Sequence, residues 1–161
     1  MEKIDINDPI NYMLSEHFSL YDLIRSGSAE KLGIDNNPLT NGDKNPIVDN
    51  LKILCETILE PLYDLLGPLK INSGYRSPEV NKAVGGSNRS QHRYGKAVDF
   101  VCSLSVEDTF QTIIKNNLDY DQLLQEFDRW THISYDKDKE TQRRSTLRVV
   151  SKNGKITYLP A

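Results

Sequence analysis

Two short segments of the sequence contain residue types that could bind a metal ion. His92 and Asp99 lie in SQHRYGKAVDF, and His132 lies in EFDRWTHISY. The chain has 3 histidines, so two of them fall in these segments. Imidazole nitrogen and carboxylate oxygen are common zinc ligands, and catalytic zinc sites use three protein ligands with a fourth position left for water. His92, Asp99 and His132 are therefore candidate ligands of such a site.

His92 and Asp99 can reach one ion only if the chain bends between them. On a straight helix they would be about 10 Å apart, and on a straight strand more than about 20 Å apart. Gly95 lies between them and can adopt the positive φ of a sharp bend. Asp99 sits in the apolar run AVDFV, where a carboxylate needs a partner. The alternatives are an exposed or arginine-paired acid at Asp99 and a packed strand histidine at His132.

Glu126 and Asp128 are the acids near His132 that could accept a proton from water. In one unbroken strand Glu126 would lie about 20 Å from His132. A turn at Asp128-Arg129 would bring Glu126 back beside His132, and aspartate is common in turns. Geometry therefore favours Glu126 as base. Arg76 follows a glycine turn and suits a carboxylate or a developing oxyanion, with a surface salt bridge as its alternative role.

The elements that must position these residues follow from local patterns. Helices are expected after the N-caps Ser19, Ser77 and Ser105, over Ala29–Leu32, and most clearly over Ile47–Leu66, where Pro61 is a candidate kink. A loop is expected over Asn36–Pro46. Strands are expected over Leu69–Asn72, Ala97–Val101, Asp121–Phe127, Thr131–Tyr135, Leu147–Ser151 and Lys155–Leu159, the last two joined at Asn153-Gly154.

Helices dominate residues 1–68 and strands dominate residues 69–161, a pattern typical of an α+β domain with an antiparallel sheet. No repeat or linker divides the 161 residues, so we expect one domain over 1–161. The net charge of −3 argues against binding nucleic acid or an anionic membrane. No secretory signal and no apolar run of roughly 18–20 residues is present. Cys55 and Cys102 are expected to be free, buried thiols.

The segments SGYRSPEVNKAVGGSNRSQHRYGKAVDF and EFDRWTHISY together resemble the zinc D-alanyl-D-alanine carboxypeptidase family. That family includes phage and bacterial peptidoglycan peptidases and shares its fold with the signalling domain of hedgehog proteins. The resemblance rests on Ser-x-His-x-x-Gly-x-Ala-x-Asp, from Ser90 to Asp99, and on Trp130-Thr-His132. It covers residues 71–100 and 122–135, and FSLYDLIRSGSAEKLGIDN also resembles the N-terminal segment of short, single-domain members.

The resemblance implies a hedgehog/DD-peptidase-like fold and hydrolysis of peptide bonds in bacterial peptidoglycan. The bond would be at a terminal D-Ala or within the stem peptide or cross-link. The implied site residues are His92, Asp99 and His132 on zinc, Glu126 as general base, and Arg76 and Ser90 in contact with substrate or oxyanion. The expected partners are stem peptides, without nucleic acid or membrane, and the chain is expected to be a monomer.

Two alternatives to a peptidase remain open. One is a catalytically silent zinc module that binds the wall or serves in a virion. The other is a closed structural zinc site, for which only the remote His17 is left as a fourth ligand. Without an export signal, we expect synthesis in the cytoplasm and action on the wall after release, as for a phage or prophage lysis enzyme. A signal removed from the chain is the alternative.

Overall fold

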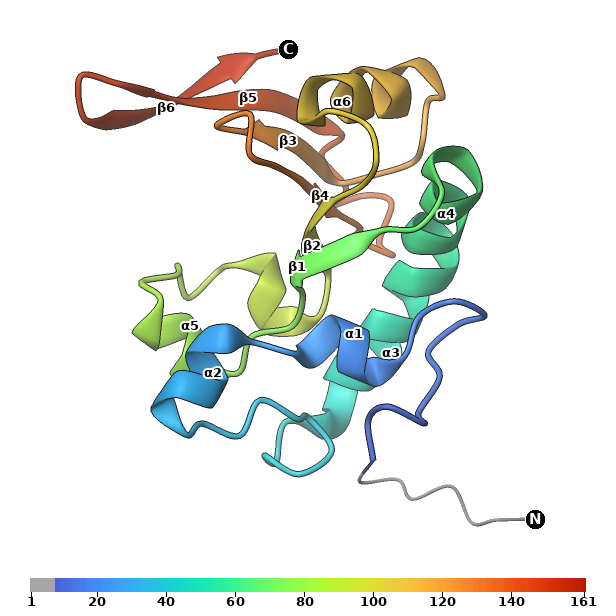
Figure 1. Ribbon diagram of the computed structural model, residues 1–161, viewed down its shortest axis with the longest axis vertical. Coiled ribbons are helices and arrows are strands. Elements are labelled where there is room, and N and C mark those ends of the chain that lie inside the picture. The colour runs from blue at the N-terminus through green and yellow to red at the C-terminus, as the bar shows by residue number, and fades with distance from the viewer. Residues whose placement is uncertain (1–7) are drawn as a thin grey trace.

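The computed structural model describes residues 8–161, with the backbone alone described at residues 44 and 45. The helical elements are α1 (Leu20–Ile24), α2 (Gly27–Leu32), α3 (Lys44–Leu54), the π-helical turn η1 (Cys55–Leu59), α4 (Glu60–Leu66), α5 (Pro78–Ala83), the 3-10 turn η2 (Gln91–Tyr94) and α6 (Val106–Lys115). The strands are β1 (Lys70–Ser73), β2 (Ala97–Val101), β3 (Gln122–Glu126), β4 (Trp130–Ser134), β5 (Ser145–Lys152) and β6 (Lys155–Pro160). The α+β prediction is confirmed. Helices α1, α2, α3 and α5 gather at one end, and the sheet with α6 forms the other (Figure 1).

Serine side chains begin several of the predicted helices. Ser19 accepts a hydrogen bond from the Asp22 N–H, and the Asp22 carboxylate accepts one from the Ser19 N–H, which completes the predicted capping box. Ser77 and Ser105 each accept an N–H from the residue three positions on. One boundary differs from the prediction, because α2 begins at Gly27 rather than at Ala29.

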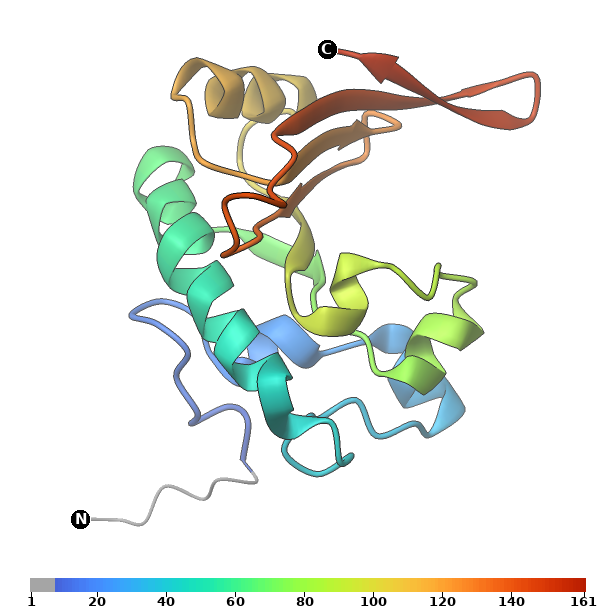
Figure 2. The ribbon, with the colours of Figure 1, turned by 180° about the vertical axis from the view of Figure 1, so that it is seen from behind.

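The helix predicted over Ile47–Leu66 is present, but it begins at Lys44, so the predicted loop over Asn36–Pro46 ends too late. Pro46 fits within the first helical turn because an N–H there has no partner inside the helix. The helix also widens before Pro61, where the Glu60 N–H bonds to the Cys55 carbonyl in η1. Pro61 has no N–H to donate to the preceding turn, and the wider π-helical turn accommodates the missing hydrogen bond. Seen from behind, α3 and α4 form one continuous column from the helical end to the sheet (Figure 2).

The sheet has six strands in the order β1-β2-β4-β3-β5-β6. The expectation of an antiparallel sheet is wrong for one pair, because β3 and β5 run parallel and the sheet is mixed. The cause lies in the connection over residues 135–144. Ser134 at the end of β4 pairs with Gln122 at the start of β3. The chain then passes to the far edge of β3 and starts β5 from that same end, with Ser145 paired to Gln122.

The predicted hairpin between the last two strands is confirmed. Asn153 and Gly154 both have positive φ, 51° and 75°, as the tight turn of a two-residue hairpin requires. The β5–β6 hairpin extends beyond the rest of the sheet (Figure 1). Tyr158 of this hairpin lines the same cleft as His92 and His132.

One hydrophobic core joins the helical end to the sheet. Its members come from the long helix, from α6 and from alternate positions of the strands, and include Leu51, Ile58, Leu62, Val98, Phe100, Phe110, Ile113, Leu123 and Ile133. Because strand side chains alternate, the residues between these positions face away from the core. Cys55 is buried, whereas Cys102 is half-buried, and both are free. Within residues 8–161 no helix combines the length and apolar character needed to cross a bilayer.

Candidate metal centre

Strand pairing places Asp99 and His132 side by side. The two are direct partners in the antiparallel β2–β4 ladder, so their side chains lie on the same face of the sheet. Their neighbours Val98 and Ile133 pair on the opposite face, inside the core. The metal-site face and the core face are therefore fixed by one register.

His92 reaches the same place from η2, before β2 begins. Gly95 ends this turn with φ 69°, which is the bend expected from the sequence. A side chain at Gly95 would also lie 3.1 Å from the Ile47 carbonyl oxygen, so the turn packs closely against the long helix. Ser90 is the N-cap of η2, and its hydroxyl accepts a hydrogen bond from the His92 N–H at 3.3 Å. Ser90 thus positions the His92 turn and also lines the cleft.

The potential ligand atoms of these three residues converge. Asp99 Oδ1 lies 2.8 Å from His132 Nδ1, and Asp99 Oδ2 lies 3.4 Å from His92 Nε2. All three donor atoms lie within 4.8 Å of one another. A tetrahedral zinc ion with bonds of about 2.0–2.1 Å needs ligand atoms about 3.3 Å apart. The residues therefore fit a zinc ion in both chemistry and spacing.

The Gly74 carbonyl sets the orientation of the His92 ring. Its oxygen lies 2.8 Å from His92 Nδ1. Because a carbonyl only accepts hydrogen bonds, Nδ1 must carry the proton, and Nε2 presents its lone pair toward Asp99. Such a partner on the outer nitrogen is the usual support of a metal-binding histidine.

We predict that Gly74→Ala weakens both the fold and metal binding. The added Cβ would lie 2.2 Å from the Leu23 backbone oxygen, so this backbone must shift and take the carbonyl with it. The expected cost is about 1–3 kcal/mol of stability and about 10–100-fold in zinc affinity. Thermal unfolding and competition with a chelator measure the two effects. Gly27→Ala is the control, because its Cβ meets nothing within 4 Å; equal behaviour of the two variants would contradict the prediction.

Asp99 is ionised at neutral pH. Burial opposes the charge, but the hydrogen bond from His132 Nδ1 and the nearby imidazole of His92 outweigh it and hold the pKa of Asp99 well below its usual value. Its side chain is only 17% exposed. A carboxylate with this charge and burial meets the requirement for a metal ligand.

Glu126 lies beside the three residues at the end of β3. Its Oε1 is 3.8 Å from His132 Nδ1. Burial, followed by the negative charge of Asp99, raises the pKa of Glu126. The β3–β4 turn that brings it there begins one residue earlier than predicted. Both Phe127 and Asp128 have positive φ, 57° and 56°, and the Arg129 N–H bonds to the Glu126 carbonyl.

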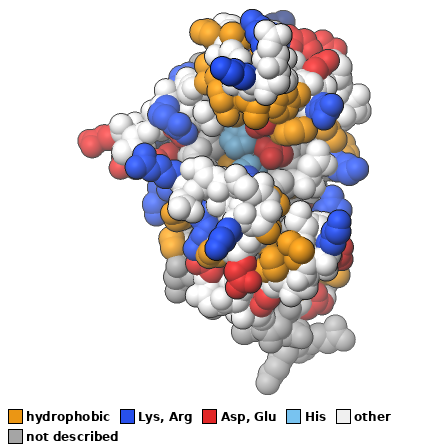
Figure 3. Space-filling view, turned by 90° about the vertical axis from the view of Figure 1, so that its left-hand side faces the viewer, with side chains coloured by type: hydrophobic (Ala, Val, Ile, Leu, Met, Phe, Trp, Pro, Cys, Tyr) orange, Lys and Arg blue, Asp and Glu red, His pale blue; other side chains and the backbone are white. Residues whose placement is uncertain are grey.

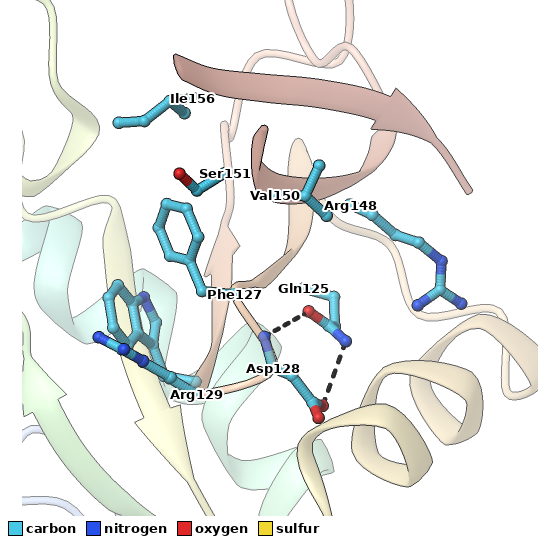
Figure 4. Close-up of a pocket in the computed structure, with 9 residues that line it drawn as sticks. Gln125, Phe127, Asp128, Arg129, Arg148, Val150, Ser151 and Ile156 are labelled. Atoms are coloured by element: carbon cyan, nitrogen blue, oxygen red, sulfur yellow. Dashed lines mark hydrogen bonds between the residues drawn. The ribbon is translucent and has the colours of Figure 1, made fainter. Parts of the chain in front are cut away.

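Asp128, the rival base, is an exposed turn residue. Its N–H donates to Gln125 Oε1 at 2.9 Å, and its carboxylate accepts from Gln125 Nε2 at 3.3 Å, as the dashed lines in Figure 4 show. The side chain lines a groove of about 640 Å³ between the β3–β4 turn and the β5–β6 hairpin. Trp130 lines both this groove and the histidine cleft.

Arg76 lies in the cleft that contains the three candidate ligands. Its N–H donates to the His92 carbonyl at 2.9 Å. Burial lowers the pKa of Arg76, and the charges of Asp99 and Glu126 oppose this shift. Among the described residues, two buried donors in this cleft have no hydrogen-bond partner: Arg76 Nε and Trp130 Nε1.

The cleft has a volume of about 490 Å³. In Figure 3 histidine side chains lie at the bottom of a hollow, with acidic side chains beside them and hydrophobic ones under the overhanging hairpin. Its lining includes residues that the sequence did not single out, namely Arg89, Gln91, Arg143 and Tyr158. Arg89 and Gln91 lie on the segment that carries His92, whereas the tertiary fold brings Arg143, from a loop, and Tyr158, from β6, to the site.

His17 lies apart from this cleft. Its Nδ1 is 2.7 Å from Glu60 Oε2, and its ring stacks on Tyr63 at 3.9 Å between centroids. With Glu16 and Glu60 it forms a second cluster of potential ligands. Glu60 Oε1 already accepts hydrogen bonds from the Ser15 hydroxyl and the His17 N–H. These contacts are those of a packing residue, and His17 does not supply a fourth ligand to the cleft.

The chain is similar to a known family of peptidases. A family model described as Peptidase M15 matches residues 16–134, which is more than half of the chain. The match includes the three candidate ligands, Glu126, Arg76 and Ser90. No curated protein matches the chain.

Proposed function

Because the chain belongs to the peptidase M15 family, a zinc D-Ala-D-Ala carboxypeptidase-type family, we propose that it hydrolyses a peptide bond in bacterial peptidoglycan. The observation that carries the proposal is the convergence of two imidazoles and one carboxylate, with Glu126 beside them, in an open cleft. Three protein ligands are typical of a catalytic zinc site, whereas structural sites close all four positions.

His92, Asp99 and His132 would hold the zinc ion. When bound, zinc supplies a Lewis acid that lowers the pKa of water and polarises a carbonyl oxygen. The ionised Asp99 contributes the negative charge of the site. The Gly74 carbonyl keeps His92 Nε2 free for the metal.

Glu126 serves as the general base. It takes the proton of the attacking water and then passes it to the departing amine. A single positioned carboxyl group can act first as a base and then as an acid in this way. Burial and the charge of Asp99 raise the pKa of Glu126, which favours uptake of the proton from water. Glu126 Oε1 lies 3.8 Å from His132 Nδ1, which supports this role because a base must lie close to the residues that would hold the metal.

Arg76 and Trp130 bind the oxygen atoms of the substrate. Their unpaired buried donors would otherwise remain unsatisfied, which is costly in a protein interior. An oxyanion that develops during attack supplies an acceptor for the Arg76 guanidinium. Ser90 lines the same cleft and is a further substrate contact.

The substrate is a stem peptide, cut at a terminal D-Ala or at an internal or cross-link bond, by a monomeric enzyme with the fold of hedgehog signalling domains. Release onto the wall by a phage or prophage lysis system fits such an activity.

Mass spectrometry of wall digests tests the proposal directly. Purified peptidoglycan is incubated with the zinc-loaded protein and, in parallel, with protein and chelator. We expect new muropeptide fragments only in the first sample, and their masses identify the bond. Bound zinc at one ion per chain without any new fragment would instead favour a silent wall-binding module.

A further inference from the structure

We propose that Arg143 forms a carboxylate-binding subsite next to the metal centre, so that the substrate carries a free carboxylate close to the bond that is cut. This inference rests on the proposed function and names the chemical class of its substrate. Arg143 lies outside residues 16–134, so the family match does not supply it.

A buried acid clamps one edge of the Arg143 guanidinium. Asp121 is buried, and it accepts hydrogen bonds from the Arg143 N–H at 2.6 Å and from Arg143 Nη2 at 2.7 Å. Arg143 Nε adds a further bond to Asp121 Oδ2 at 3.2 Å. Asp121 precedes β3 and Arg143 precedes β5, so the parallel pairing of these strands brings the two together.

The clamp extends to the turn that carries a metal ligand. Gln91 Nε2 donates to Asp121 Oδ2 at 2.8 Å, and Gln91 Oε1 accepts from Arg143 Nη2 at 3.2 Å. Gln91 immediately precedes His92. The position of the Arg143 side chain is therefore fixed relative to the metal centre, and a bound carboxylate would be held in a defined register with the scissile bond.

The other edge of the guanidinium remains available. Within the described part of the chain, Arg143 Nη1 donates to no acceptor, and the Arg143 side chain is 53% exposed and lines the cleft. Arginine has five donors in a planar fork, and an edge left free beside a clamped one suits a carboxylate oxygen. A residue needed only to neutralise Asp121 would not have to face the cleft.

The charges around the cleft favour the same ligand. The acids that line it, Asp99 and Glu126, belong to the metal centre, whereas the exposed Arg89 and Arg143 add cationic groups to the lining. Arg143 is paired with the buried Asp121, but Asp121 does not line the cleft. A peptide with a free carboxylate is therefore attracted to these guanidinium groups and oriented by them.

Binding measurements with the zinc-loaded Glu126→Gln protein test the subsite without turnover. The probes are a synthetic stem peptide with free carboxylates, the same peptide amidated at its C-terminus, and the same peptide amidated at its internal acidic residue. Isothermal titration should show about 10–100-fold weaker binding for one amide, as for the loss of a charge-assisted hydrogen bond. The amide that binds weakly identifies which carboxylate Arg143 holds.

The same titrations are repeated after Arg143 is changed. Arg143→Gln alone would leave the buried Asp121 without its cation, so this change is combined with Asp121→Asn. Arg143→Lys keeps the positive charge but removes the planar set of guanidinium donors. We expect the double variant to bind acid and amide within about threefold of each other. Arg144→Gln, an exposed neighbour bonded to Asn117, is the matched control and should retain the full preference.

Equal binding of the acid and both amides to the Glu126→Gln protein would overturn the subsite, as would a preference that survives in the double variant. These outcomes are separable from those of the proposed function. Hydrolysis of the wall without a carboxylate preference would support the proposed function and contradict the subsite. A carboxylate preference that depends on Arg143, without any hydrolysis, would support the subsite and contradict the proposed function.

Discussion

Glu126→Gln is expected to lower kcat for wall-peptide hydrolysis by about 10²–10⁴-fold, with zinc content and fold unchanged. The amide keeps the size and polarity of the side chain but cannot accept the proton of the attacking water. The substitution also removes the negative charge of Glu126, which is repelled by the charge of Asp99. It therefore relieves repulsion rather than creating strain. Release of muropeptide fragments, measured with metal content on the same sample, gives the result.

Asp128→Asn is the matched control for this prediction. Asp128 is the other acid near His132 in the sequence, but it lies in the turn and lines the neighbouring groove. Asparagine tolerates the positive φ found at this position, so the turn should be kept. We expect activity within about threefold of the unchanged enzyme. A severe loss in Asp128→Asn together with normal rates in Glu126→Gln would reverse the assignment of the base.

Removal of zinc is expected to lower hydrolysis by at least about 10³-fold, because the Lewis acid contributes several kcal/mol to the stabilisation of the transition state. It should also change tryptophan fluorescence. Trp130 is the single tryptophan of the chain and lines the cleft with His132, so its emission reports on the site directly. Titration of zinc into the metal-free protein should reach its end point at one ion per chain.

Histidine variants separate this site from the second cluster of potential ligands. His132→Gln should lose the fluorescence response and the tight zinc ion. His17→Gln should keep both, because His17 bonds to Glu60 away from the cleft. Zinc binding that survives His132→Gln but disappears in His17→Gln would show that the metal binds elsewhere.

Much of the candidate site could be predicted because its geometry is local. The bend at Gly95 and the turn after Glu126 each follow from a few neighbouring residues, and both occur. The apolar run around Asp99 predicts a buried strand, and strand β2 has the predicted bounds. Register then brings Asp99 and His132 together.

The features that the sequence did not predict depend on contacts between distant segments. The parallel β3–β5 pair depends on the path of residues 135–144, which carry no strand pattern of their own. The clamp on Arg143 depends on that pair, since Asp121 lies 22 residues away in the chain. The Gly74 carbonyl that orients His92 is a backbone group, and side-chain types do not reveal it.

The direct pairing of Asp99 with His132 limits how the family can vary in length. An insertion of one residue within β2 or β4 would turn one ligand into the core and expose an apolar neighbour, so both metal binding and packing would fail together. The connection over residues 102–121 leads from β2 through α6 to β3 and does not set that register. Changes of length are therefore expected in its exposed loops rather than in α6, which packs in the core, and homologues should differ in size there while β2 and β4 keep a constant length.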